Sequence, residues 1–114
     1  MRAPLAGMVG LALLSACVQP GEPLRQPQQT VVFNPDAYGL AVLPGNQRVD
    51  FGRSPKGVIP ALTRELGRPT TMPLTGCPAG IIQRLRWADL ELSFTPERFV
   101  GWRRGAEQRG LVCS

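Results

Sequence analysis

The sequence contains no histidine, a single lysine (Lys56) and only three cysteines among its 114 residues. Because histidine is the commonest general base and metal ligand near neutral pH, its absence removes the usual centre of catalytic and metal sites. Signatures of nucleophile elbows, phosphate-binding loops, dinucleotide-binding loops and Cys-x-x-Cys pairs are also missing. We therefore expect no catalytic residues, no metal, no small-molecule cofactor and no enzymatic activity.

Two pairs of residues come nearest to a catalytic site. Ser54 and Lys56 could form a Ser/Lys dyad, but such a dyad needs a buried lysine, and Ser54 before Pro55 is better explained as a helix cap. Asp89 and Glu91 could act as paired carboxylates. Asp89 suits a turn, however, and Glu91 is expected to face Arg86, so structural roles are favoured for both.

A long hydrophobic run is also missing. Residues 5–16 are uncharged and mostly apolar, but a transmembrane helix needs ~20 such residues. The length fits the apolar region of a secretory signal peptide, which spans ~7–15 residues and ends in small residues. The sequence therefore predicts export at the N-terminus and not a transmembrane helix.

The run ends in Leu14-Ser15-Ala16-Cys17, which resembles the lipobox of bacterial lipoproteins. The resemblance implies that residues 1–16 are a signal peptide. Its removal would make Cys17 the N-terminal residue, which is then acylated. Stable anchoring needs at least two acyl chains, which a triacylated Cys17 would supply. Val18, in place of the Asp that retains enteric lipoproteins in the inner membrane, favours the outer membrane. The alternatives are an ordinary signal peptide with an incidental Cys17 and a buried N-terminal helix.

Residues 17–30 are rich in proline and glutamine and too poor in apolar residues to build a core. They are predicted to be a tether, and residues 31–114 a small domain in the periplasm. The net charge of +5 favours anionic partners or is simply a solvated surface. Nucleic acid is not expected as a partner of an exported protein.

Cys77 and Cys113 remain once Cys17 is assigned to lipid. An even number of cysteines in an oxidising compartment predicts one disulfide between them. The alternative is two unpaired thiols.

One amphipathic helix is expected between Ser54 and Gly67. Ser54 is a good N-cap, Pro55 suits the first helical position, and Gly67 suits the C-cap. Pro60 conflicts with a regular helix because it lacks an N–H group. Either the helix is kinked there, or its regular part starts near Pro60 after a looser turn.

Short strands are expected at residues 30–33, 40–43 and 49–51, with a turn at Asn34-Pro35-Asp36. A hairpin is predicted around Ala88-Asp89, since this turn pairs Trp87 with Leu90 and Leu85 with Leu92 on one face. It also sets Arg86 opposite Glu91 as an exposed ion pair. Residues 99–102 form the third strand, residues 103–110 are polar, and residues 111–113 return to the core. The predicted fold is α+β, with one helix packed on a small antiparallel β-meander and one disulfide.

The order of helix, Leu66-Gly67-Arg68-Pro69 and antiparallel strands resembles small outer-membrane lipoproteins of the BamE/SmpA type. The strand Leu90–Phe94 and Arg98-Phe99-Val100 also match. The resemblance implies an accessory role in β-barrel assembly. That family has two helices before its sheet, whereas one is found here, and no partner-binding residues are carried over.

Trp102 is the predicted partner-binding residue. If Phe94 pairs with Phe99, strand alternation turns Val100 and Trp102 away from the core, beside Arg103 and Arg104. An apolar patch rimmed by charge usually marks an interaction site. The alternatives are that the aromatic residues are simply core, and that a bulge reverses the strand and buries Trp102.

Three functions follow from these observations. The favoured one is a non-enzymatic lipoprotein of the cell envelope, lipid-anchored through Cys17 and facing the periplasm, whose domain binds another envelope protein. The second is a binder of an anionic envelope polymer through an arginine-rich face. The third, a small hydrolase, is least favoured because histidine is absent.

The lipid anchor predicts that Cys17→Ser abolishes acylation, because the acceptor thiol is lost. The variant is expected to accumulate as an uncleaved precursor or a soluble species. Labelling cells with radioactive palmitate measures this directly, and label in the variant would contradict the prediction.

Overall fold

The computed structural model describes residues 30–114. The predicted signal peptide (residues 1–16), the lipid anchor at Cys17 and most of the tether (residues 17–30) lie outside the described residues. Residues 31–114 form one unit, described here by itself. Within it, no helix is long and apolar enough to span a membrane.

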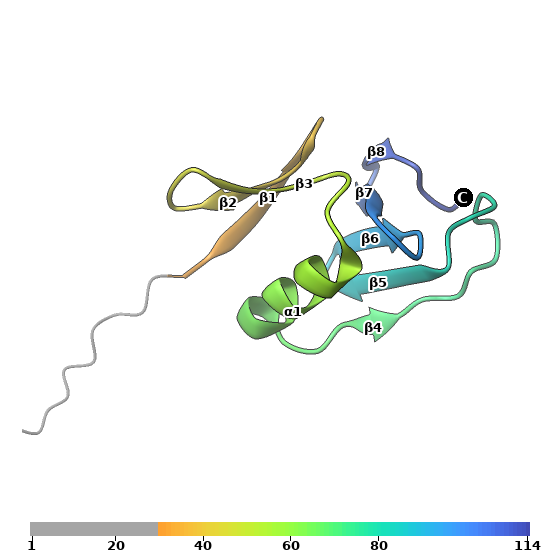
Figure 1. Cartoon of the computed structure of the whole chain (residues 1–114), viewed down its shortest axis with the longest axis horizontal. Helices are drawn as coiled ribbons and strands as arrows, with labels where there is room; N and C mark the ends of the chain where they lie inside the picture. Colours follow the sequence, from red (N-terminus) through yellow and green to blue (C-terminus); the bar gives the residue numbers. More distant parts are fainter. Residues whose placement is uncertain (1–29) are drawn as a thin grey trace, which may run out of the picture. The chain divides into compact units, whose positions relative to one another are not determined.

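The unit contains one helix and eight strands, which Figure 1 shows in chain order from orange to blue. The elements are β1 (Val32–Asp36), β2 (Gly39–Leu43), β3 (Gln47–Asp50), α1 (Pro55–Leu66), β4 (Thr70–Thr71), β5 (Gln83–Trp87), β6 (Leu90–Phe94), β7 (Phe99–Arg104) and β8 (Glu107–Gly110). The first sheet has the order β1-β2-β3, and the second has the order β4-β5-β6-β7-β8. All neighbouring strands are antiparallel. The predicted α+β fold is confirmed, with two meanders in place of one.

Helix α1 begins and ends where the sequence predicts. The Ser54 hydroxyl accepts a hydrogen bond from the backbone N–H of Lys56 (3.1 Å), and Gly67 caps the C-terminus with a φ of 93°. The helix runs from Pro55 through Pro60 without a break, so residues 55–59 are helical and not a looser turn. Val58 and Leu62 are its buried residues, and they hold the helix to the core.

The predicted hairpin of β5 and β6 is confirmed in its register. Trp87 pairs with Leu90, Leu85 with Leu92, and Arg86 with Glu91. The apolar members of these pairs are buried. They belong to one core with residues of the first sheet and α1, namely Phe33, Leu40, Val49, Val58 and Leu62.

The predicted exposed ion pair between Arg86 and Glu91 is wrong. Glu91 is buried, and its carboxylate accepts from Nε of Arg84 at 2.6 Å. Arg84 is the diagonal neighbour of Glu91, within reach of a long side chain across two strands. Arg84 also donates to Pro73 O (2.8 Å), so the ion pair is enclosed by the loop before β5, and Arg86 stays exposed.

Three local predictions differ from the structure. Asn34-Pro35-Asp36 belongs to β1 and is not a turn. Proline is accepted there because β1 is an edge strand, where a missing N–H costs no ladder hydrogen bond. The pairs β4–β5 and β7–β8 were not expected, because Thr70–Thr71 and Glu107–Gly110 carry no apolar alternation, and both strands are exposed.

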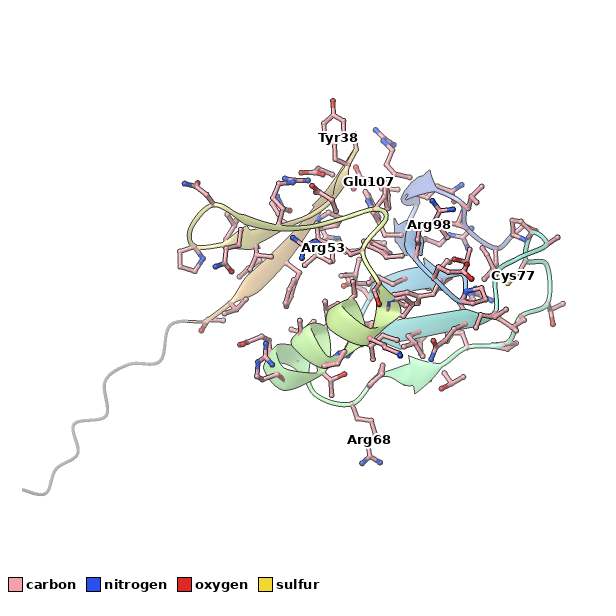
Figure 2. The ribbon with its side chains drawn as sticks, viewed as in Figure 1. Tyr38, Arg53, Arg68, Cys77, Arg98 and Glu107 are labelled. Carbon is pink, nitrogen blue, oxygen red and sulfur yellow. A yellow bond between two sulfur atoms is a disulfide. The ribbon has the colours of Figure 1, made fainter. Side chains whose placement is uncertain are left out.

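The predicted disulfide between Cys77 and Cys113 is confirmed. It fastens the loop before β5 to the C-terminal segment, which lies against β7 at Gly101, where any Cβ atom would collide with the carbonyl oxygen of Leu111. Figure 2 labels Cys77 at this side of the domain. Because disulfides persist in oxidising surroundings, the bridge indicates a compartment outside the cytoplasm.

Reducing this disulfide is expected to lower the urea midpoint of unfolding and leave the helix content unchanged. The bridge links residues 36 positions apart, which corresponds to roughly 3–4 kcal/mol in the chain-entropy model, and α1 packs elsewhere. Circular dichroism during urea titration tests this. The variant with serine at both positions serves as the control and should not respond to reductant. Free thiols in the oxidised protein by mass spectrometry would contradict the prediction.

Candidate functional site

The predicted outward position of Trp102 is wrong. Its side chain is 3% exposed, and its indole Nε1–H donates to the backbone carbonyl of Asp36 at 2.7 Å. Phe94 does pair with Phe99, as expected, but Ser93 pairs with Gly101, so Val100 is an extra residue in β7. This β-bulge shifts the alternation by one residue and turns Trp102 onto the core face.

The neighbours of Trp102 do not form a rimmed apolar patch either. Val100, Arg103 and Arg104 are all half-buried. The guanidinium of Arg103 donates to the carbonyl of Cys113 (2.6 Å) and to the side chain of Gln108 (3.1 Å). Arg103 therefore holds the C-terminal segment in place.

A groove of about 710 Å³ lies between the first sheet and α1. Its apolar wall comes from the inner face of β1, β2 and β3 and from the helix. Its polar rim carries three arginines. The lining residues are Val31, Phe33, Val42, Asn46, Gln47, Arg48, Val49, Arg53, Gly57, Val58, Ala61, Arg64 and Glu65.

Small residues on α1 keep this groove open. Gly57 and Ala61 are one helical turn apart and continue into Arg64 and Glu65, so the four side-chain positions share one stripe of the helix. A Cβ atom added at Gly57 would have no neighbour within 4 Å. The spacing of Gly57 and Ala61 beside the apolar stripe was the signal in the sequence that could have indicated this site.

Three arginines and one carboxylate, that of Glu65, are among the lining residues of the groove. Arg48 is held by Asp36 (Nη2–Oδ1, 2.7 Å) and by Asp50 (Nε–Oδ1, 2.7 Å). The hydrogen bond from Arg48 lowers the pKa of Asp36 below its ordinary value. Arg64 lies 3.9 Å from Glu65 and stays largely exposed.

Arg53 is the arginine of the groove that forms no ion pair within residues 30–114. It lies where the chain passes from β3 into α1, and in the view of Figure 2 it is seen between the first sheet and the helix. Within residues 30–114, no carboxylate lies within 4.0 Å of its guanidinium. An anionic group in the groove would meet Arg53 without displacing an existing ion pair.

Two of the residues considered as catalytic candidates have structural roles. Ser54 caps α1, and Glu91 is paired with Arg84. Among residues 30–114, no group of three or more His, Cys, Asp or Glu side chains is arranged to hold a metal ion. The Oγ of Ser93 is buried without a hydrogen-bond partner in this part of the chain.

Fold and site together define a small disulfide-bonded α+β domain with an open, arginine-rimmed groove. Compared with protein families, with curated proteins and with solved structures, the chain shows no significant match. The resemblance to BamE/SmpA-type lipoproteins therefore stays a prediction.

The buried position of Trp102 predicts a large loss of stability in Trp102→Ala. Truncating a core tryptophan typically costs ~3–5 kcal/mol, and here the carbonyl of Asp36 also loses its donor. Urea unfolding followed by circular dichroism measures the change. Trp102→Phe, which keeps an aromatic ring and removes only the N–H donor, should lose clearly less. An unchanged midpoint in Trp102→Ala would show that the residue is not core.

Proposed function

We propose that this protein is a non-enzymatic lipoprotein of the cell envelope whose domain binds a segment of another envelope protein. The lipobox at residues 14–17 supplies the anchor, and residues 18–30 supply the tether. The disulfide between Cys77 and Cys113 fits the oxidising periplasm. Val18 and the resemblance to BamE/SmpA-type proteins favour the outer membrane and an accessory role in an assembly.

The groove between the first sheet and α1 is the observation that carries this proposal. Its volume of about 710 Å³ lies within the ~300–1,000 Å³ of pockets that enclose a small molecule, so it has room for several side chains of a partner. Its wall includes Val31 and Val42, which are only half-buried. Covering this apolar wall with side chains of a partner would remove it from water, which favours binding.

A protein partner fits this groove better than an anionic polymer does. The polymer hypothesis requires an exposed arginine-rich face, drawn from Arg84, Arg86, Arg103 and Arg104. Of these only Arg86 is exposed, whereas Arg84 is paired with Glu91 and Arg103 binds the C-terminal segment. The arginines of the groove border an apolar wall, which a sugar or phosphate polymer would not fill. Their charge instead attracts acidic residues at the ends of a partner segment.

Photo-cross-linking from position 57 tests the proposal in living cells. Replacing Gly57 with p-benzoylphenylalanine attaches the reactive group at a lining position of the groove, where a Cβ atom would have no neighbour within 4 Å. We expect irradiation to give a discrete protein adduct in the envelope fraction. Immunoblotting and mass spectrometry of the adduct provide the measurement.

The matched control carries the same reactive residue at Lys56, which is exposed on the same helix but does not line the groove. It is expected to give no such adduct. Equal adducts from both positions, or none from position 57 in a variant that folds normally by circular dichroism, would refute the proposed function.

A further inference from the structure

The third strand of the first sheet has a free edge. Strand β3 pairs with β2 on one side, and in the part of the chain that the structure describes no strand pairs with it on the other. A free edge presents unpaired N–H and C=O groups to a further strand.

The ladder between β2 and β3 shows which groups face this edge. Phe51 N donates to Tyr38 O at 3.0 Å, and antiparallel pairs alternate between hydrogen-bonded and non-hydrogen-bonded. The hydrogen-bonded pairs therefore include Val49 with Leu40, whereas Arg48 belongs to a non-hydrogen-bonded pair. The backbone N–H and C=O of Arg48 consequently point to the free edge.

The same rule applies to Asp50, two residues further along β3. Its N–H also points to the edge, and its C=O accepts from Arg53 N at 3.3 Å. Three backbone groups of β3 are therefore directed outward without a strand partner.

This edge borders the groove. β1 contributes alternate residues to the lining, Val31 and Phe33, as expected of one face of a strand. From the turn before β3 and from β3 itself, four consecutive residues, 46–49, line the groove. Residues from both faces of β3 therefore line the groove, as expected where the groove reaches the edge of the strand.

We propose that an extended segment of the partner binds as a fourth strand on the free edge of β3, with alternate side chains entering the groove. This inference rests on the proposed function and names the kind of partner. The segment would pair with the backbone of Arg48 and Asp50, place apolar side chains against Ala61 and Val42, and bring carboxylates to Arg53 and Arg64. Main-chain bonds supply affinity in such strand addition, and the pockets supply specificity.

The edge is also protected against indiscriminate pairing. β3 is only four residues long and carries charged Arg48 and Asp50, and both features discourage association between identical edges. A heterologous acidic segment is thus favoured over a second copy of this cationic chain.

Three fluorescein-labelled octapeptides test the chemistry, with the full chain and its disulfide intact. The Val/Glu peptide has Val at alternate positions, Ser between them and Glu at both ends. The second peptide carries Lys in place of each Glu, and the third, the Ser/Glu peptide, carries Ser in place of each Val. Fluorescence anisotropy is expected to show binding of the Val/Glu peptide at least tenfold tighter than of the other two. Absence of Val/Glu binding would overturn the inference. Equal binding of the Ser/Glu peptide would also overturn it, since charge alone would then suffice.

A pair of variants at Arg48 tests the backbone contact. Arg48→Ala and Arg48→Pro both remove the ion pairs to Asp36 and Asp50, but only proline removes the outward N–H. Proline is accepted where the N–H of an edge strand faces outward, so both variants should fold. Arg48→Pro is expected to bind the Val/Glu peptide at least tenfold more weakly than Arg48→Ala. Equal affinities would overturn strand addition.

Amide hydrogen exchange provides an independent readout. Binding of the Val/Glu peptide should slow exchange at Arg48 at least tenfold and leave Val49, already bonded to β2, nearly unchanged. No slowing at Arg48 would refute the added strand. If Arg48 exchange is not slowed but position 57 still cross-links to a protein, the added strand is refuted and the proposed function stands. If that cross-link is also absent, the proposed function is refuted as well.

Discussion

The indole of Trp102 joins the two sheets. Its N–H donates to Asp36 O, where β1 ends, and its ring fills the core shared by both sheets and α1. Backbone hydrogen bonds also connect the segment after β3 with the second sheet. Gly52 N donates to Phe99 O, and Phe99 N donates to Arg53 O, both at 2.8 Å. Because the first sheet forms one wall of the groove, these contacts set how far that wall stands from α1.

Two glycines, Gly101 and Gly57, shape the surfaces of the domain. At Gly101 the missing Cβ lets the C-terminal segment lie directly on β7, and this segment, the disulfide and Arg103 close the outer face of the second sheet. At Gly57 the missing side chain leaves an unfilled space beside the first sheet. The two glycines thus have opposite effects, since one allows a face to close and the other keeps a groove open.

Local signals predicted much of this fold. Alternation of apolar residues fixed the pairing of Trp87 with Leu90, and Ser54 and Gly67 fixed the ends of α1. The orientation of Trp102 could not be obtained in this way, because a single extra residue, Val100, reverses every later side chain of the strand. The groove was missed for a related reason. It depends on the distance between two elements joined by long-range contacts, and sequence periodicity describes only one element at a time.

The order of strands in the two sheets has a consequence for how the chain folds. In both sheets the spatial order follows the chain order, so every strand pairs with its neighbour in sequence and most pairings close short loops. Such local topology favours rapid folding. The contact between Trp102 and Asp36 spans 66 residues and joins two meanders that are each built from local strand pairings. One wall of the groove is the first sheet, so the width of the groove depends on a contact that closes a far longer loop than any hairpin of the fold.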